Sequence, residues 1–392
     1  AVTLRTMLRI CCISYINILG ETYGYRDHRT DGMDAETAKI LQETELYART
    51  GIQKQVFNTV YQLMAVKQQT PELLQRAKTL LMLPDYFGFR LTGNKLSEYT
   101  NGSTTQLVNP NTFQWDTDLI RKLGYPEDIF LPLQMPGTKV GQLLPEIQKE
   151  VGFNLEVVLC GSHDTASAVM AVPQTSGDGI YISSGTWSLM GIESLKPIIN
   201  EEAAAANFTN EGGYDHRFRF LKNIMGLWMI QSVRHEYNDA YSFAQLCEMA
   251  EDSRDFPSRV DVNDPSFLSP DSMVEAIKKY CQKTGQPVPE SVGELASVVY
   301  RSLAQSYGET VSSLEKIAGR TYDSIHIIGG GSNAAYLNQL TADATGKTVY
   351  AGPGEATAIG NLLAQMIYAE ELTDLKSARQ CVRDSFEIKT FV

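Results

Sequence analysis

The chain has 392 residues, 43% of them hydrophobic and 20% charged, which fits a soluble globular protein long enough for two domains. Its formal net charge of −12 argues against nucleic acid as the main partner, because phosphate binding favours a basic surface. No stretch is apolar for long enough to form a membrane-spanning helix, so we expect no membrane partner. The six cysteines include no CxxC pair, which indicates neither a zinc site nor a disulfide framework and favours a cytoplasmic location.

The first 150 residues predict mainly helices. Residues 1–20 lack a cleavage site that would suit a signal peptide, and we interpret them as strand-rich. Apolar residues at helical spacing predict a helix over 35–50 that stops at Gly51, and two later helices separated at Thr70–Pro71. The segment 132–144, rich in Pro and Gly, is typical of a linker or hinge.

From about residue 150 the pattern changes to one of strands alternating with helices. We predict a buried strand over 155–160, a hairpin over 179–194 with a Ser-Gly-Thr turn, and a long helix over 295–319. A strand, a triple-glycine turn and a helix follow over 324–345. This mixture predicts an α/β architecture.

The loop "GSHDT" at 161–165 follows the predicted buried strand and has two interpretations. Ser162 and Asp164 are residue types that cap the start of a helix. Alternatively, the loop carries a carboxylate to a ligand site, because open α/β sheets bind ligands beyond the carboxyl ends of their strands. The residues of the loop alone leave both interpretations open.

Two further turns have the residue types of phosphate-binding loops. Ser183–Thr186 and Gly329–Gly331 each follow a predicted strand, and their backbone amides could cradle an anion. Neither matches GxGxxG or the P-loop pattern, so ordinary tight turns are the alternative. Together with the carboxylate loop, they favour phosphoryl transfer, in which Asp164 would be the base for the attacking hydroxyl.

Many motifs together resemble those of the FGGY carbohydrate kinases, a branch of the actin-like ATPase superfamily. They follow the family's order from about residue 20 to the end, and include "YRDHRTDGM", "SHDTASAV", "YISSGTWSLMGIES", "NFTNEGG", "LKNIMGLW" and "HIIGGGSNAAYL". The resemblance implies two RNase H-like domains flanking a cleft, which we place at 1–145 on the sugar side and 146–392 on the nucleotide side. It also implies transfer of the ATP γ-phosphate to O1 of L-rhamnulose, with Mg²⁺, and leaves the oligomeric state open.

The resemblance assigns roles to residues of the matching motifs. Asp164 is implied as the general base, and the metal ligands are left unknown, since an aspartate expected for Mg²⁺ or sugar is missing from the chain. We expect Asn223 and Gln231 on one helix, about 12 Å apart, with the wet face of an amphipathic helix as the alternative. The implied contacts are His163, Asp164, Thr165 and Asn223 for the sugar, and Thr186, Gln231 and Gly330 for ATP.

His163 has two interpretations of its own. It either binds a sugar hydroxyl and tunes Asp164, or it is a satisfied structural histidine. A protonated His163 would favour the ionised form of Asp164, but the sequence does not fix its protonation.

The chain departs from the family at its start. The family's first phosphate loop has no counterpart before "YRDHRTDGM", so we expect a chain truncated at the N-terminus, with an incomplete first domain and doubtful activity by itself. One alternative function is a kinase for another ketose or polyol. Another is a non-catalytic nucleotide-binding protein of the superfamily, which would need no base at Asp164.

Overall fold

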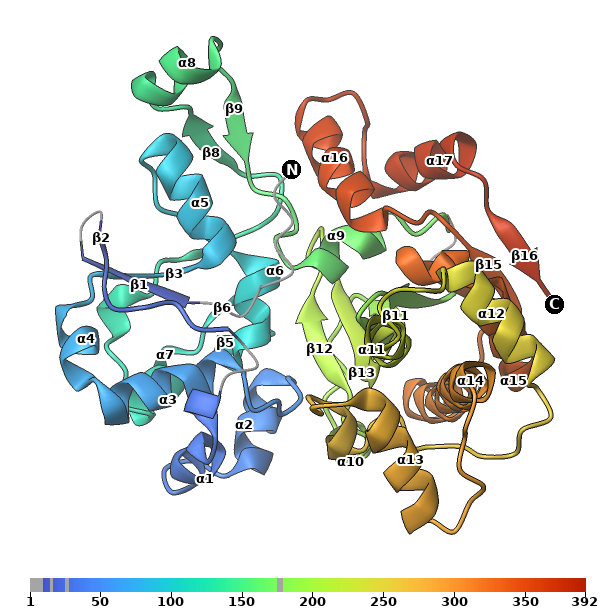
Figure 1. Cartoon of the computed structure of the whole chain (residues 1–392). Helices are drawn as coiled ribbons and strands as arrows, with labels where there is room; N and C mark the ends of the chain where they lie inside the picture. The colour runs from blue at the N-terminus through green and yellow to red at the C-terminus, as the bar shows by residue number, and fades with distance from the viewer. Residues whose placement is uncertain (1–9, 15–16, 25–27, 175–178) are drawn as a thin grey trace. The chain divides into compact units, whose positions relative to one another are not determined.

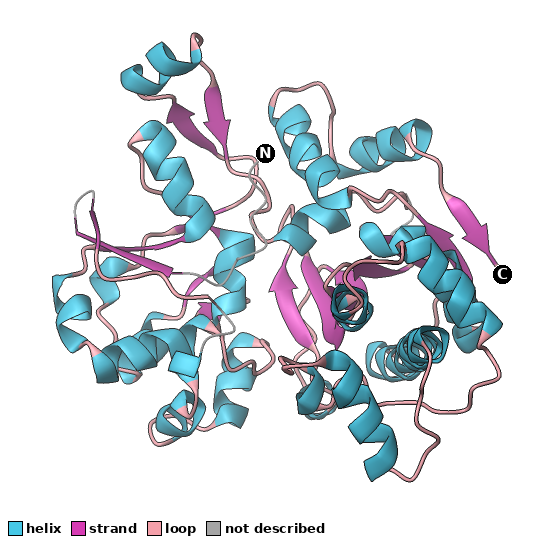
Figure 2. Ribbon diagram, viewed as in Figure 1, coloured by secondary structure: helices cyan, strands magenta, loops and turns pink. Residues whose placement is uncertain are grey.

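The computed structural model groups the chain into two compact units, each built from separate segments of the sequence (Figures 1 and 2). The structure describes residues 10–14, 17–24, 28–174 and 179–392. Unit 1 comprises the described residues up to Met170 with Glu193–Phe220 and Thr357–Ala378, and unit 2 comprises Ala171–Ile192, Leu221–Ala356 and Arg379–Val392.

Unit 1 combines short helices with several small sheets. Its strands are β1 Ile10–Ser14, β2 Asn17–Ile18, β3 Thr79–Met82, β4 Ser97–Glu98, β5 Val108–Asn109, β6 Gln114–Trp115, β7 Leu133–Gln134, β8 Lys139–Gln142, β9 Glu156–Val158 and β12 Thr209–Gly212. Its helices are α1 Met33–Ala38, α2 Glu43–Thr50, α3 Thr59–Gln69, α4 Pro71–Arg76, α5 Leu83–Thr92, α6 Tyr99–Gly102, α7 Thr117–Lys122, α8 Pro145–Val151, α9 Asp164–Met170 and α10 Glu201–Ala205, followed much later by α16 Ala356–Tyr368.

Unit 2 is built on a mixed sheet in which β13, β11, β10, β14, β15 and β16 follow one another. The strands are β10 Ile180–Ser184, β11 Trp187–Ser194, β13 Phe218–Met225, β14 Ser324–Ile328, β15 Thr348–Ala351 and β16 Lys389–Phe391. The helices are α11 Trp228–Glu236, α12 Phe243–Asp252, α13 Met273–Lys283, α14 Val292–Ala318, α15 Ala335–Thr345 and α17 Leu375–Ser385, and α14 packs against α12 and α15 (Figure 1).

The segment 193–220 packs with the N-terminal part of the chain in unit 1. The Tyr47 hydroxyl donates to the carbonyl of Phe208 at 2.9 Å, and the Gly212 amide donates to Ser103 Oγ at 2.8 Å. This grouping by packing differs from the single sequence boundary expected between the two domains. That boundary stays a prediction about the domains of the family.

Helix ends signalled by Gly, Pro and Ser agree with the structure. Gly51 ends α2 with a left-handed φ of 68°, and Thr70–Pro71 separates α3 from α4. The predicted long helix is α14, which begins after a capping box formed by Ser291 and Glu294. The helix expected over 35–50 is instead two helices, α1 and α2. The expected strand-rich start is confirmed for β1 and β2, Leu19 and Gly20 lie in no strand, and residues 1–9 and 15–16 lie outside the described ones.

Two predictions between residues 130 and 160 were wrong. The expected linker at 132–144 contains β7 and β8 and belongs to unit 1. The buried strand expected over 155–160 is the short β9, which pairs with β8 in a two-stranded sheet. Its residues Glu156–Val158 are exposed or half-buried, because a two-stranded ribbon leaves side chains open to water. The apolar run was therefore a poor guide to burial here.

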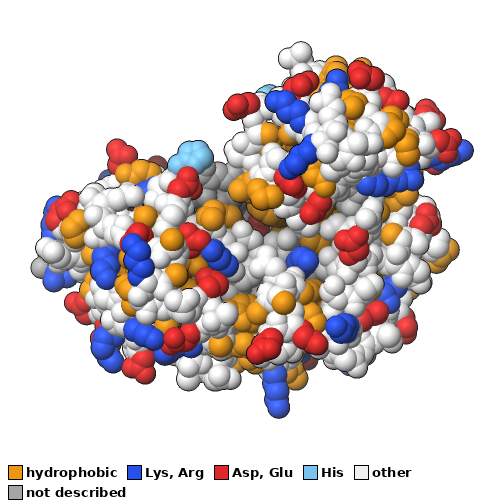
Figure 3. All heavy atoms as spheres, turned by 90° about the horizontal axis from the view of Figure 1, so that it is seen from below, with side chains coloured by type: hydrophobic (Ala, Val, Ile, Leu, Met, Phe, Trp, Pro, Cys, Tyr) orange, Lys and Arg blue, Asp and Glu red, His pale blue; other side chains and the backbone are white. Residues whose placement is uncertain are grey.

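Charged side chains of both signs are interspersed over the face drawn in Figure 3, as is typical of a surface in contact with water. Within the described part of the chain, no helix combines the length and the hydropathy needed to cross a bilayer.

The sheet of unit 2 buries a histidine, His326, which is paired in register with Tyr350. Their rings stack with centroids 5.2 Å apart. Burial, together with the charges of Arg379 and Arg383, lowers the pKa of His326 from 6.5 to about 4. The folded protein therefore keeps this imidazole neutral at pH values where the unfolded chain already binds a proton.

We expect the stability of the protein to fall as the pH drops from 6.5 towards 4, and His326 to account for roughly 3 kcal/mol of that loss. The sign follows from the lowered pKa of His326. Its contribution to stability is complete above pH 6.5 and is lost as the pH falls towards the folded-state pKa of about 4. Urea denaturation of the wild type and of His326→Gln at several pH values measures it. Parallel pH profiles for the two proteins would contradict the assignment.

Candidate active site

The loop at 161–165 connects β9 to α9 in unit 1 and is fixed by its own backbone. The amides of Ala166 and Ser167 donate to the carbonyl of His163 at 2.9 and 3.2 Å, which closes the first turn of α9. Ser167 Oγ also donates to the carbonyl of Gly161 at 2.6 Å. This loop therefore has a defined shape that presents the side chains of His163 and Asp164.

A buried carboxylate, Glu98, ties this loop to the start of α6. Its Oε2 accepts from the Ser162 amide at 3.1 Å and from Ser162 Oγ at 2.5 Å. The same side chain caps α6, because it accepts from the amides of Thr100 and Asn101 at 2.7 and 3.1 Å. Thr100 Oγ1 in turn accepts from the His163 amide at 3.3 Å. Glu98 thus joins two segments that are far apart in sequence.

Burial raises the pKa of Glu98, although its bonds from Ser162 and Thr100 oppose the rise. A second buried acid, Asp85, accepts from the Glu98 amide at 3.2 Å. Burial and the neighbouring Glu98 raise the pKa of Asp85 well above its usual value. We therefore expect Asp85 to hold its proton, so that the two carboxyl groups are not both charged.

Asp164 is the first residue of α9, and its side chain is 38% exposed. Its Oδ1 accepts from Thr165 Oγ1 at 3.0 Å and lies 3.8 Å from His163 Nδ1. The exposed part of the carboxylate is accessible to a ligand, which a base requires. The capping interpretation of Asp164 is not decided by these contacts.

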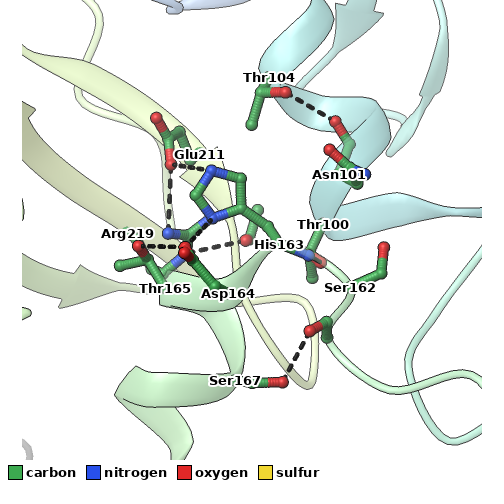
Figure 4. A network of polar contacts seen from close by, with 12 residues as sticks. Thr100, Asn101, Thr104, Ser162, His163, Asp164, Thr165, Ser167, Glu211 and Arg219 are labelled. Atoms are coloured by element: carbon green, nitrogen blue, oxygen red, sulfur yellow. Dashed lines mark hydrogen bonds and ion pairs between the residues drawn. The ribbon is translucent and has the colours of Figure 1, made fainter. Parts of the chain in front are cut away.

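His163 is surrounded by charged groups of unit 1 (Figure 4). Its Nε2 lies 3.6 Å from Glu211 Oε2, and Arg219 Nη1 lies 3.1 Å from the same oxygen. Burial and the Arg219 charge lower the pKa of His163 well below its usual value. This direction favours a neutral imidazole.

In unit 2, the predicted phosphate turns lie next to each other. Gly329 and Gly331 both lie against Ser184 at the end of β10. A Cβ on Gly331 would collide with Ser184 Oγ, and one on Gly329, where φ is 84°, would lie 2.9 Å from the Ser184 carbonyl. The glycines are needed because the turn and the end of β10 are in close contact.

The start of α11 is bonded to the same region of unit 2. The amides of Leu227 and Trp228 donate to the carbonyls of Gly185 and Thr186 at 3.0 and 3.1 Å. Gln231 lies one turn farther along α11. The elements that carry Thr186, Gln231 and Gly330, the three predicted ATP residues, therefore converge at the end of β10.

The expectation that Asn223 and Gln231 share one helix was wrong. Asn223 lies in β13, and Gln231 lies in α11, separated by the turn at Gly226. A Cβ on Gly226 would lie 2.5 Å from the backbone of Trp187, so this turn requires a glycine. The roles of both residues remain predictions.

Sequence reasoning missed three charged residues of the site: Glu98, Glu211 and Arg219. Glu211 lies within the quoted motif "NFTNEGG" but received no role, and Glu98, at the start of "EYTNG", received none either. The pattern "FRFLK" gave no signal for Arg219, because strand alternation places its side chain on the face opposite the two Phe side chains. Arg219 is fully buried, and its Nε donates to the Gly212 carbonyl at 2.9 Å.

We expect Glu98→Ala to lower the free energy of unfolding by roughly 3–5 kcal/mol, because several buried donors lose their acceptor. Glu98→Gln should cost less, about 1–3 kcal/mol, because one amide oxygen still accepts while the NH₂ group opposes the Thr100 amide. The exposed pair of Glu127 with Arg121 offers a control: Glu127→Gln should cost less than about 1 kcal/mol. Equal costs for Glu98→Gln and Glu127→Gln in urea denaturation would contradict the anchoring role.

Comparison with protein families matches the chain twice. Residues 17–171 match the N-terminal domain of the FGGY family of carbohydrate kinases, and residues 180–369 match its C-terminal domain. Proteins named rhamnulokinase are similar over most of the chain. That of Halalkalibacterium halodurans is 52% identical over 95% of this chain and 80% of its own length, and that of Bacillus subtilis is 46% identical over 95% and 76%.

Solved structures of sugar kinases have the same fold at low sequence identity. A ligand-bound xylulose kinase from Lactobacillus acidophilus superposes with a TM-score of 0.79 at 15% identity, covering 98% of this chain and 78% of that one. A Plasmodium falciparum glycerol kinase with ADP gives 0.77 at 15% identity, covering 98% and 77%. Because the matched domains together span most of the sequence and the relatives exceed 40% identity, the chain belongs to the FGGY family of carbohydrate kinases.

Proposed function

We propose that this protein transfers the γ-phosphate of ATP to O1 of L-rhamnulose, giving L-rhamnulose 1-phosphate and ADP in L-rhamnose catabolism. The observation that carries the proposal is the 40–52% identity to several rhamnulokinases over about 95% of the chain. The matches to the two family domains include the loop of Asp164 and the glycine turn of Gly330. A cytoplasmic location, as for other enzymes that use the cell's ATP, is part of this proposal.

Asp164 is the proposed general base on the O1 hydroxyl. Phosphoryl transfer requires positioning, charge neutralisation and a group that takes the proton of the attacking hydroxyl. The partial exposure of Asp164 and the anchoring of its loop by Glu98 support this role. His163 and Thr165 on the same loop, with Asn223 of β13, are the proposed sugar contacts.

The proposed nucleotide site comprises Thr186, Gln231 and Gly330. A Cβ built on Gly330 meets no atom within 4 Å, whereas its two neighbouring glycines are tightly packed. The middle glycine therefore borders open space, as a residue beneath a bound adenosine would. Backbone amides of the Thr186 turn are the proposed phosphate donors.

Mg²⁺ is proposed to arrive with ATP. Among the described residues, no group of three or more His, Cys, Asp or Glu side chains could hold a metal ion. This suits Mg²⁺, which is commonly bound by substrate phosphates, water and one or two carboxylates. When bound, the ion would neutralise charge on the transferring phosphate.

A kinase for another ketose or polyol is the alternative, because small differences in pocket shape decide between sugars. A coupled ADP-release assay of the protein with L-rhamnulose, L-fuculose, D-xylulose, D-ribulose and glycerol distinguishes the two. If kcat/KM is highest for L-rhamnulose, the proposal is supported. If it is higher for another substrate, that substrate and not L-rhamnulose is the preferred one.

We expect Asp164→Asn to lower kcat by roughly 10²- to 10⁴-fold, because the amide keeps the shape of the side chain but cannot accept the proton. The Kd for ATP and the melting temperature should stay close to the wild-type values. If Asp164 only caps α9, Asn would replace it with little loss, since Asn caps about as well as Asp. Steady-state kinetics and thermal melting of one variant therefore separate the two roles.

Gly330→Val should raise the Kd for ATP by about tenfold or more, because the new side chain occupies the open space beside the glycine turn. The melting temperature should change little, since no atom lies within contact distance of the new Cβ. Gly88→Val in α5 is the control, because its Cβ would make only an ordinary contact with Val140. Titration calorimetry measures the Kd for ATP of both variants. Equal Kd values for Gly330→Val and Gly88→Val would contradict the placement of Gly330 in the nucleotide site.

A further inference from the structure

Helices α14 and α15 of unit 2, which pack against each other, border a groove of about 540 Å³ (Figure 1). This volume lies in the range of about 300–1,000 Å³ that is usual for small-molecule sites. The polar residues that line the groove are Arg259, Arg301, Gln305, Glu309, Ser312 and Asp343. None of them is among the proposed sugar or ATP contacts, so the kinase site leaves this groove without a role.

Two arginines of the groove are held side by side by backbone carbonyls of the loop that follows α12. The Phe256 carbonyl accepts from Arg301 Nη1 at 2.9 Å and from Arg259 Nη1 at 3.4 Å. Arg259 Nη1 also donates to the Ser258 carbonyl at 2.6 Å, and Arg301 Nη1 also donates to the Arg254 carbonyl. Because both Nη1 atoms bond to one oxygen, the two guanidinium groups are close to each other and fixed in place.

The charges of these two arginines are not balanced by the protein. Within the described part of the chain, neither Arg259 nor Arg301 forms an ion pair, and their Nε and Nη2 atoms have no hydrogen-bond partner. Burial, together with the nearby charge of Arg301, lowers the pKa of Arg259 to about 10. The Nε and Nη2 edge of a guanidinium can bind a carboxylate or a phosphate through two parallel hydrogen bonds. An anion in the groove would therefore use the open edges and relieve the repulsion between the two charges.

Two carboxylates, Glu309 of α14 and Asp343 of α15, line the same groove. Each accepts at 2.9 Å from a glutamine one turn earlier on its own helix, Gln305 for Glu309 and Gln339 for Asp343. A carboxylate repels an anion but accepts hydrogen bonds from hydroxyl groups. A bare phosphate ion therefore suits only the arginines, whereas a molecule that carries both a phosphate and hydroxyl groups suits the whole groove.

We propose that the groove beside α14 and α15 binds a sugar phosphate, with the phosphate group on Arg259 and Arg301 and sugar hydroxyl groups donating to Glu309 and Asp343. The phosphate of such an ester carries up to two negative charges, which match the two arginines. The site is separate from the proposed sugar and ATP contacts. The inference therefore does not depend on which sugar the kinase phosphorylates.

Titration calorimetry with D-glucose 6-phosphate tests the site directly. ADP is present at a saturating concentration, so that the proposed nucleotide site is occupied. We expect a Kd for D-glucose 6-phosphate below about 1 mM. Inorganic phosphate and D-glucose, the two parts of this probe, should each bind at least about tenfold more weakly. Absence of binding, or equal affinity for inorganic phosphate, would overturn the inference.

Variants of the two arginines locate the bound phosphate. Arg259→Gln and Arg301→Gln should each raise the Kd for D-glucose 6-phosphate by about tenfold or more. The exposed Lys279→Gln of α13 removes the same charge outside the groove and should keep the wild-type Kd. If Arg301→Gln does not fold, Arg301→Lys, which keeps a charged donor but loses the planar fork, replaces it and should also weaken binding. Folded arginine variants that bind as tightly as Lys279→Gln would overturn the inference.

A variant of the acidic side of the groove distinguishes a sugar phosphate from a simple anion. Glu309→Ala removes an acceptor for hydroxyl groups and also removes a negative charge. The Kd for D-glucose 6-phosphate should therefore rise by about threefold or more, while inorganic phosphate should bind more tightly than to the wild type. If both ligands bind Glu309→Ala more tightly, the carboxylate acts only by repulsion, and the assignment of a sugar phosphate is wrong.

Discussion

The buried carboxylate of Glu98 is the group on which the geometry of the loop at 161–165 depends. It accepts hydrogen bonds both from the start of α6 and from Ser162, 64 residues later in the chain. Without an acceptor at this point, the amides of two segments would be buried without partners, which is costly. The placement of His163 and Asp164 is therefore set by a group that need not touch substrate.

In unit 2, close packing and backbone hydrogen bonds, and not a buried carboxylate, hold the predicted phosphate turns in place. Ser184 at the end of β10 fits against Gly329 and Gly331, and the first amides of α11 bond to Gly185 and Thr186. Strand end, turn and helix start are thereby held in one arrangement.

Local signals in the sequence predicted the elements that depend on local interactions. The glycine stop of α2, the break at Thr70–Pro71 and the hairpin of β10 and β11 follow from residues within a few positions of each other. Long-range contacts determine the features that the sequence did not predict. The exposure of β9 depends on how few strands pair with it, and the partners of Glu98 and Arg219 lie in distant segments or across a strand turn. The placement of Asn223 in a strand depends on the pairing of β13 with β11, a contact between separate segments that no periodicity reveals.

The complete burial of Arg219 beside Glu211 has a consequence for the evolution of these kinases. Loss of either partner alone leaves a buried charge unpaired, at a cost of about 3–5 kcal/mol, which is a large part of the stability of a typical domain. Replacement of both by apolar residues avoids that cost. Stepwise replacement of the pair therefore passes through a destabilised single mutant. We expect the residues at positions 211 and 219 to change together or to stay the same among related proteins.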